Sequence, residues 1–235
     1  MMAARPLTKV IINPVGRHTS TVVFLHGLGD TGEGWAPVAR EIAPLFPHTK
    51  FILPNAPIQP VTLNMGMKMP SWYDIVSLSS LEEHEDEKGL TESSRSVTSI
   101  IREEVDNGIP ASRIVLGGFS QGGAVTCFTG LTTEYKLAGF IMLSTYLPLR
   151  TKIGRMESNV NKKTPILMCH GEADPVVQFA YGMNSHLRLK ELGYNVTFKS
   201  YRGMGHSSSP QELRDMVEFL KQVLPEDATA ASASV

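Results

Sequence analysis

One serine lies in a sequence context that suits a nucleophile. The segment Gly118-Phe119-Ser120-Gln121-Gly122 matches the Gly-x-Ser-x-Gly pattern, in which the serine occupies a strained turn between a strand and a helix. Glycines on both sides of such a turn let neighbouring backbone pass without a clash. The apolar run Ile114–Leu116 before the motif predicts a strand, and a helical pattern over 121–133 follows. A glycine-rich turn without chemistry would also fit these residues, so the identification depends on partners elsewhere in the chain.

A serine hydroxyl needs a general base to take its proton. In α/β-hydrolases the three groups follow the chain order serine, acid, histidine, and three histidines come after Ser120. His206 lies in a glycine-rich loop between the last expected strand and the last helix, where scaffold loops often carry catalytic groups. His170 ends an expected strand, and His186 falls within a helical pattern. We therefore expect His206 to be the base, with a purely structural loop histidine as the alternative.

Two acidic residues follow the expected strand Ile166–Met168 closely enough to orient that histidine. These are Glu172 and Asp174, and Asp174 is favoured because Pro175 fixes a turn that aspartate readily initiates. The acid would accept the Nδ1–H of His206, hold its tautomer and stabilise the imidazolium. A turn-forming aspartate without a role in chemistry is the alternative.

Acyl transfer also requires backbone N–H groups that face the developing oxyanion. One donor is the residue after the nucleophile, here Gln121, and the other comes from an early loop after a strand. Phe24-Leu25-His26-Gly27-Leu28-Gly29-Asp30 is such a loop, and Leu28 is the expected second donor. A phosphate-binding loop is disfavoured, since the full Gly-x-Gly-x-x-Gly spacing and a Walker lysine are both missing from this segment.

Short apolar runs alternate with helical patterns along the chain, as in an α/β protein with a mostly parallel central sheet and helices on both faces. We expect an α/β-hydrolase domain over 21–225 with a loop insertion at about 54–90, an N-terminal extension or edge strand over 1–20, and a flexible tail over 226–235. The acidic run Glu82–Glu87 within the insertion is expected to be a solvated surface segment. The expected helices cover about 34–44, 91–106, 121–133, 178–192 and 210–223. The expected strands are Val22–Leu25, Lys50–Leu53, Ile114–Leu116, Phe140–Leu143, Ile166–Met168 and Val196–Ser200.

Composition and charge restrict the number of domains, the kinds of partner and the expected location of the protein. The 235 residues suit one α/β domain, and the formal net charge of -1 provides no global field that would attract nucleic acid. The two cysteines, Cys127 and Cys169, do not indicate a disulfide framework, and we see neither a secretory leader nor an apolar run long enough to span a bilayer. The sequence thus predicts a cytoplasmic protein.

Several longer motifs, in order along the chain, resemble the acyl-protein thioesterase/lysophospholipase group of small α/β-hydrolases. The likeness runs from about Thr21 to Leu224. Its motifs are Leu25-His26-Gly27-Leu28-Gly29-Asp30-Thr31-Gly32, Pro60-Val61-Thr62-Leu63-Asn64-Met65, Pro70-Ser71-Trp72-Tyr73-Asp74-Ile75, Gly117-Gly118-Phe119-Ser120-Gln121-Gly122-Gly123-Ala124 and Gly205-His206-Ser207.

The resemblance implies hydrolysis of long-chain acyl thioesters on S-palmitoylated proteins, without a metal or cofactor. Hydrolysis of lysophospholipids or of small carboxylesters is the alternative. It implies a triad of Ser120, Asp174 and His206 with Leu28 and Gln121 as oxyanion donors, in agreement with the residue-level reading. It also implies that the segment 62–75 lines an acyl channel beside the active site. The channel candidates are Leu63, Met65, Met67, Trp72, Tyr146 and Leu147, with a core position as the alternative for all but Met65 and Trp72.

Two departures from the group bear on partners and specificity. The chain has no cysteine near its N-terminus for self-acylation, although transient membrane association remains compatible with the resemblance. Thr145 and Tyr146 stand where related sequences often carry other small and aromatic residues, so the acyl-chain preference is expected to differ from theirs. Monomer and weak homodimer both stay open.

Overall fold

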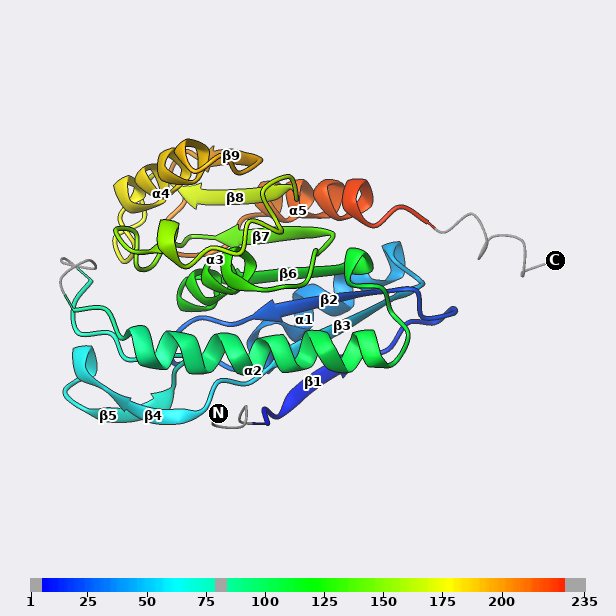
Figure 1. The fold of residues 1–235 in the computed structure, drawn as a ribbon, viewed down its shortest axis with the longest axis horizontal. Helices are drawn as coiled ribbons and strands as arrows, with labels where there is room; N and C mark the ends of the chain where they lie inside the picture. The colour runs from blue at the N-terminus through cyan, green and yellow to red at the C-terminus, as the bar shows by residue number, and fades with distance from the viewer. Residues whose placement is uncertain (1–5, 79–83, 227–235) are drawn as a thin grey trace.

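The centre of the molecule is a seven-stranded sheet in the strand order β1-β3-β2-β6-β7-β8-β9. The structure is a computed structural model that describes residues 6–78 and 84–226. Every neighbouring pair in this sheet is parallel except β1, which runs antiparallel to β3 at one edge (Figure 1). The strands are β1 (Lys9–Ile12), β2 (Ser20–Leu25), β3 (Thr49–Pro54), β6 (Ile114–Phe119), β7 (Gly139–Leu143), β8 (Ile166–Gly171) and β9 (Val196–Tyr201).

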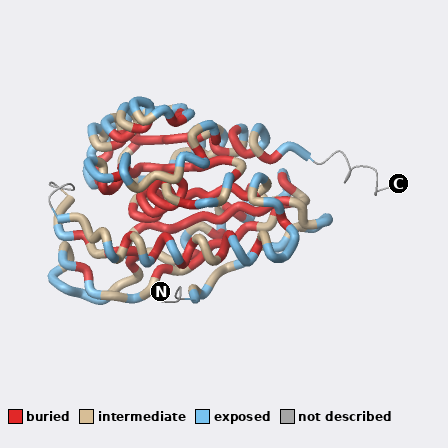
Figure 2. The backbone as a smooth tube through the Cα atoms, viewed as in Figure 1, coloured by how far each residue is buried: buried red, intermediate tan, exposed pale blue. Residues whose placement is uncertain are grey.

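Helices cover both faces of the sheet, which confirms the expected α/β architecture. One core packs α1 (Gly32–Ile42) and α5 (Pro210–Val223) against the sheet. The other packs α2 (Glu87–Asp106), α3 (Gln121–Thr132) and α4 (Phe179–Glu191) against the opposite face. The sheet between these layers is buried along most of its length (Figure 2). Within residues 6–78 and 84–226, we find no helix that combines the length and the apolar character needed to cross a bilayer.

Helix α3 is the most deeply placed helix, since all residues from Gln121 to Leu131 are buried. It carries glycines where it meets side chains of neighbouring segments. A Cβ on Gly123 would approach Thr145 to 2.7 Å, and a Cβ on Gly130 would approach the Phe140 ring to 2.6 Å. These glycines let the helix lie close against the sheet directly after Ser120.

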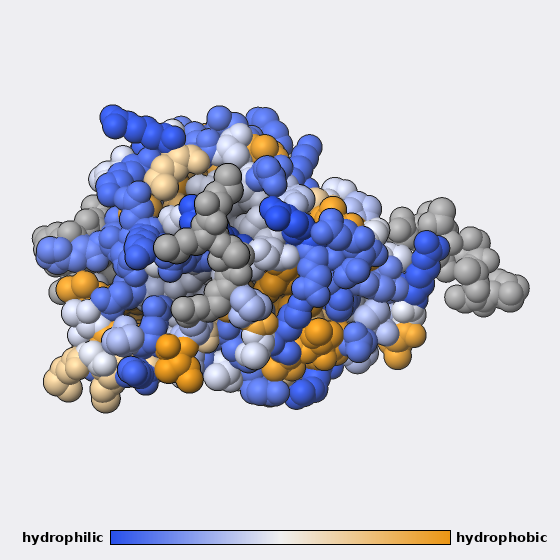
Figure 3. All heavy atoms as spheres, turned by 60° about the horizontal axis from the view of Figure 1, so that its bottom comes forward, coloured by the Kyte–Doolittle hydropathy of each residue, from blue (hydrophilic) through white to orange (hydrophobic). Residues whose placement is uncertain are grey.

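The region expected as a loop insertion is more ordered than its composition suggests. It contains a hairpin of β4 (Ile58–Val61) and β5 (Met67–Pro70), which lies outside the main sheet. The turn end of the hairpin is fastened to the segment after β5, because the Asp74 carboxylate accepts hydrogen bonds from the Thr62 N–H at 2.7 Å and the Thr62 hydroxyl at 2.5 Å. Apolar side chains show on the surface over this hairpin, at the left end of the molecule (Figure 3).

The acidic run differs from the expectation of a solvated segment. Asp86 caps α2 by accepting from the Gly89 N–H at 2.8 Å, so that helix begins at Glu87, four residues before the expected start. Glu85 accepts from the Leu149 N–H, and Glu87 pairs with Lys152. These carboxylates are half-buried. They connect the start of α2 to the segment around Leu149 and Lys152, because they accept hydrogen bonds from a backbone N–H and from the lysine there. Glu82 and Glu83 lie outside the described residues, as does the tail after 226.

Candidate active site

Three side chains that are far apart in the sequence form one chain of hydrogen bonds at the carboxyl ends of the strands. The Ser120 Oγ lies 2.9 Å from His206 Nε2, and His206 Nδ1 lies 2.7 Å from Asp174 Oδ2. Ser120 follows β6, Asp174 follows β8 and His206 follows β9. Because a carboxylate only accepts, Nδ1 carries the proton and leaves Nε2 free to accept from the serine hydroxyl. The arrangement can therefore deprotonate Ser120.

Ser120 has the backbone conformation that the motif predicts. Its φ of 54° and ψ of -120° lie outside the usual regions for residues with a side chain. The turn is fixed by a hydrogen bond from the Ser120 N–H to the Leu143 carbonyl at 2.9 Å. Glycine is required on both sides, since a Cβ on Gly118 would collide with the Gly122 backbone, and one on Gly122 with the Leu25 carbonyl. The surrounding backbone thus holds the strained serine in place.

Asp174, and not Glu172, faces His206. The Asp174 side chain is fully buried, and its Oδ1 accepts from the Val176 N–H at 2.8 Å and the Val177 N–H at 3.0 Å. Glu172 is exposed and accepts a hydrogen bond from Ser200 at 2.7 Å. A buried carboxylate needs several donors, and the two backbone N–H groups of Val176 and Val177, with the His206 ring, supply them.

The other histidines after Ser120 point elsewhere. His186 lies on α4 against the Phe198 ring, with the ring centroids 5.3 Å apart. His170 is buried in β8 beside Asp174. His206 is flanked instead by the Phe119 ring at 4.8 Å, and Trp35 extends this aromatic row. The sequence pattern did not single out these flanking rings, because their contacts join distant segments.

The two expected oxyanion donors belong to two different segments near Ser120. Gln121 is the first residue of α3, and the first N–H groups of a helix have no partner inside it. The loop after β2 passes close to the serine, since a Cβ on Gly27 would lie 3.4 Å from the Ser120 Cβ. In the described chain, neither the Leu28 N–H nor the Gln121 N–H donates to another backbone carbonyl. This leaves both N–H groups without a backbone partner, as the expected role of oxyanion donor requires.

A buried network that the sequence did not reveal holds both donor segments. The Gln121 side chain accepts from the Trp72 N–H at 2.9 Å and donates to the Tyr73 carbonyl at 2.7 Å. The Trp72 indole N–H donates to the His26 carbonyl at 2.8 Å. The Gly29 N–H donates to the Pro70 carbonyl at 2.8 Å. Residues after β5 therefore connect the oxyanion loop to the start of α3.

His26 is a structural member of this network. The Ala56 N–H donates to its Nε2 at 3.0 Å, so its Nδ1 carries the proton and donates to the Gly27 carbonyl at 2.7 Å. Burial lowers the pKa of His26, and the hydrogen bond to Gly27 only partly offsets this. A neutral ring thus fixes the loop that carries Leu28.

Comparison with known proteins places this site in a family. Residues 7–224 match the protein family described as Phospholipase/Carboxylesterase. The chain belongs to the phospholipase/carboxylesterase family. It is 48% identical to acyl-protein thioesterase 1 of Neurospora crassa over 235 residues, which cover 97% of this chain and 95% of that protein. It is 44% identical to acyl-protein thioesterase 1 of Yarrowia lipolytica over 225 residues, covering 94% of this chain and 99% of that protein.

The solved structures agree with the family. The crystal structure of Zea mays acyl-protein thioesterase 2 matches with a TM-score of 0.84 at 30% identity, covering 92% of this chain and 99% of that one. Arabidopsis thaliana SOBER1 matches with a TM-score of 0.82 at 33% identity, covering 88% and 99%. The α/β-hydrolase fold expected from the sequence is confirmed. In the described part of this phospholipase/carboxylesterase family member, no three His, Cys, Asp or Glu side chains gather as a metal site.

The expected acyl-channel residues lie in different surroundings. Met65 lies in the left-handed turn of the hairpin and is 91% exposed, whereas Trp72 is 1% exposed and belongs to the core. Met67 is 56% exposed, and Leu63 packs against the core from its edge. In this structure neither Met65 nor Trp72 lines the two pockets near Tyr146, because one side chain projects into solvent and the other is locked by its indole hydrogen bond.

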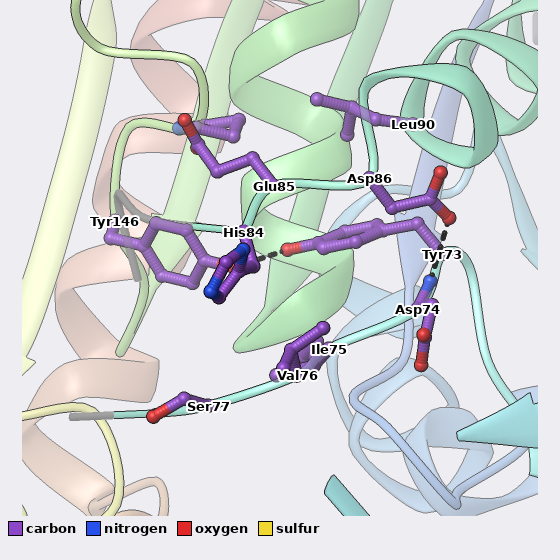
Figure 4. Close-up of a pocket in the computed structure, with 11 residues that line it drawn as sticks. Tyr73, Asp74, Ile75, Val76, Ser77, His84, Glu85, Asp86, Leu90 and Tyr146 are labelled. Carbon is purple, nitrogen blue, oxygen red and sulfur yellow. Dashed lines mark hydrogen bonds between the residues drawn. The ribbon is translucent and has the colours of Figure 1, made fainter. Parts of the chain in front are cut away.

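Tyr146 and Leu147 do line pockets in this family member. Tyr146 lines two small pockets, and Leu147 also lines one of them. Tyr73 and Tyr146 point toward each other in the other pocket (Figure 4), and their hydroxyl oxygens are 2.6 Å apart. Burial raises the pKa of both tyrosines, so both remain neutral hydroxyls. The pair joins the segment after β5 to the loop after β7.

Proposed function

We propose that this protein is an acyl-protein thioesterase that removes long-chain acyl groups from cysteine residues of S-acylated proteins through an acyl-enzyme. Ser120 is the nucleophile, His206 the general base and Asp174 the group that orients it. The observation that carries the proposal is the hydrogen-bonded chain of these three side chains beside two available amides. The named relatives in two fungi support the thioester as substrate.

The reaction follows in two steps from this geometry. As Ser120 attacks the thioester carbonyl, its proton passes to His206 Nε2 and the oxyanion receives the N–H groups of Leu28 and Gln121. Collapse of the tetrahedral intermediate breaks the carbon–sulfur bond and releases the cysteine thiolate, which takes up the proton from His206. Water then attacks the acyl-enzyme, with His206 again accepting a proton, and releases the fatty acid and free Ser120.

Recognition of the acyl chain supplies most of the binding energy in this proposal. Burial of a 16-carbon chain at about 0.8 kcal/mol per methylene gives a gross term of about 12 kcal/mol, before the entropy of ordering the chain is subtracted. Even partial burial would then exceed the contribution of contacts to the protein part of the substrate. Tyr146 and Leu147 are buried in the core and also line a pocket, and Leu63 packs against that core, so both the channel and the core alternatives stay open for them.

The alternative is a carboxylesterase or lysophospholipase that acts on small esters or lysophospholipids. The decisive experiment measures kcat/KM side by side on a palmitoylated peptide, a lysophospholipid and a short aryl ester. We expect the palmitoylated peptide to be preferred, and a preference for the short ester would contradict the thioesterase proposal.

The proposed nucleophile is tested separately with a fluorophosphonate probe. We expect Ser120→Ala to lose both labelling and activity while its unfolding curve stays close to that of the unchanged protein. Ser99→Ala, at a partly buried serine of α2 whose hydroxyl donates to the Arg95 carbonyl, is the matched control and should label normally. Retained labelling of Ser120→Ala would remove Ser120 from the mechanism.

We also propose a cytoplasmic location with transient membrane contact through the β4–β5 hairpin. The hairpin exposes 71% of Ile58, 91% of Met65 and 56% of Met67, and apolar side chains at a surface favour partition into a lipid interface. We expect Met65→Ser/Met67→Ser to reduce cosedimentation with phosphatidylcholine vesicles. Val15→Ser, which changes a residue of 90% exposure between β1 and β2, is the control. Equal cosedimentation of the two variants would contradict membrane contact by the hairpin.

A further inference from the structure

A second imidazole ring lies against the carboxylate that faces His206. His170, in β8, is 1% exposed, and its Nε2 lies 3.5 Å from Asp174 Oδ2. The same Nε2 lies 2.8 Å from the Val177 carbonyl oxygen. His170 does not reach Ser120 in this arrangement, so it is not a rival base.

The contacts of His170 define its protonation. A carbonyl oxygen only accepts, so Nε2 carries a proton that it donates to Val177, and the same N–H group lies 3.5 Å from Asp174 Oδ2. Burial lowers the pKa of His170, although the hydrogen bond to Val177 and the charge of Asp174 oppose this, while His206 acts in the same direction as burial. The ring is therefore neutral at physiological pH, with its tautomer fixed.

Helix α4 holds this ring in place. The Phe179 ring meets His170 edge-on, at an interplanar angle of 82° and a centroid distance of 6.0 Å. Gly182 backs the ring so closely that a Cβ there would collide with His170 Nδ1. The imidazole therefore has little freedom to turn away from the Asp174–Val177 turn.

Val177 is hydrogen-bonded to both Asp174 and His170, so the three residues form one connected network. The Val177 N–H donates to Asp174 Oδ1 at 3.0 Å, and the Val177 carbonyl accepts from His170. Val177 itself is 2% exposed, so water could not readily replace the imidazole as donor. Loss of the ring would release the turn that aims Oδ2 at His206.

We infer that His170 is a positioning residue that orients Asp174 toward His206. The inference rests on the proposed roles of Ser120, Asp174 and His206, and it assigns His170 a share in the chemistry without contact to the substrate. A core histidine that merely filled space would affect the amount of folded protein and leave turnover per active site unchanged.

The test compares three substitutions of His170 by turnover per active site, with sites counted by fluorophosphonate labelling taken to completion. His170→Leu removes the N–H donor. In His170→Asn the side chain is too short for its amide to reach the Val177 carbonyl. Each should lower kcat by about 10- to 100-fold, because small misplacements of catalytic groups cost that much. KM should change less than threefold, since His170 lies away from the acyl pockets. His170→Gln, whose amide N–H can reach the Nε2 position, should recover most of the activity.

A double-substitution cycle separates an effect through Asp174 from a general one. In an Asp174→Asn background, His170→Leu should lower kcat less than twofold further, because the carboxylate it orients is already gone. His186→Leu, at the α4 histidine that packs on Phe198, serves as the control and should keep normal turnover. If His170→Leu kept normal turnover per site, or acted equally with and without Asp174, the inference would be overturned. If Ser120→Ala retained activity, the proposed function itself would fail instead.

Discussion

Replacing Glu212 with glutamine should stabilise the folded protein at neutral pH and have little effect in mild acid. Glu212 lies in the first turn of α5, where its side chain is 0% exposed. Within the described residues, no donor makes a hydrogen bond of good geometry to either carboxylate oxygen, and the Ser209 backbone N–H is only a weak partner. Burial raises the pKa of Glu212 to about 8, with the Ser209 N–H partly opposing this and Asp215 adding to it. The folded state thus favours the protonated acid.

The direction of the pH dependence follows from this raised pKa. Between the usual value of 4.5 and about 8, the folded protein keeps a proton that the unfolded chain releases. The stabilising effect of the protonated form is complete below the lower pKa and is lost as the pH rises toward the upper one. The quantity to compare is the unfolding free energy of Glu212→Gln minus that of the unchanged protein. At about 1.4 kcal/mol per pKa unit, this difference should increase by about 3 kcal/mol from pH 5 to pH 7.5.

Urea unfolding at pH 5 and pH 7.5 measures this difference directly. With a slope of about 3 kcal/mol/M, the midpoint of Glu212→Gln should rise by about 1 M relative to the unchanged protein on going to pH 7.5. Glutamine can still serve the helix start, where the Ser209 hydroxyl accepts from the N–H of residue 212. Glu218→Gln, at an exposed position of the same helix, should show no such pH dependence. An equal effect of Glu212→Gln at both pH values would refute the reasoning.

Three further substitutions test the framework of the site. Gly122→Ala should abolish activity or folding, because its Cβ would enter the Leu25 backbone, whereas Gly154→Ala meets only ordinary contacts and should remain active in the same assay. Tyr146→Phe should lower the free energy of unfolding in urea by about 1–2 kcal/mol, since the buried Tyr73 hydroxyl loses its partner. Trp72→Phe should lower kcat/KM by about tenfold, because the His26 carbonyl loses the indole donor and the oxyanion loop loosens.

The sequence predicts the framework of the fold because its strands and helices carry their own local signals. The six expected strands and five expected helices all occur, and the last helix covers Pro210–Val223, the expected range. The hairpin of β4 and β5 and the early start of α2 were not predicted. The start of α2 depends on Asp86, whose carboxylate also accepts from the distant Asp74 N–H. Such tertiary contacts leave no periodic pattern in the chain.

The site divides in the same way between local motifs and long-range contacts. Ser120 and the donor segments stand in short motifs whose chemistry can be inferred from their residues, and the structure brings Ser120, Asp174 and His206 together. His26 and His170 carry no such signal, since each acts through a contact that only the folded chain creates. Glu212 would be placed on the surface by its residue type, and its burial follows only from the packing of α5 against the sheet.

If Leu28 and Gln121 are the oxyanion donors, as proposed, the segment after β5 links a pocket to the positioning of both. Trp72 bonds the loop that carries Leu28 through its indole and the start of α3 through its backbone N–H. The next residue, Tyr73, bonds the Gln121 side chain through its carbonyl and lines a pocket through its ring. A ligand that moved Tyr73 would therefore displace a bond to the residue that supplies one oxyanion donor. Because these groups are buried and fully hydrogen-bonded, such a displacement would be costly, so acyl chains that fit without it retain the productive geometry.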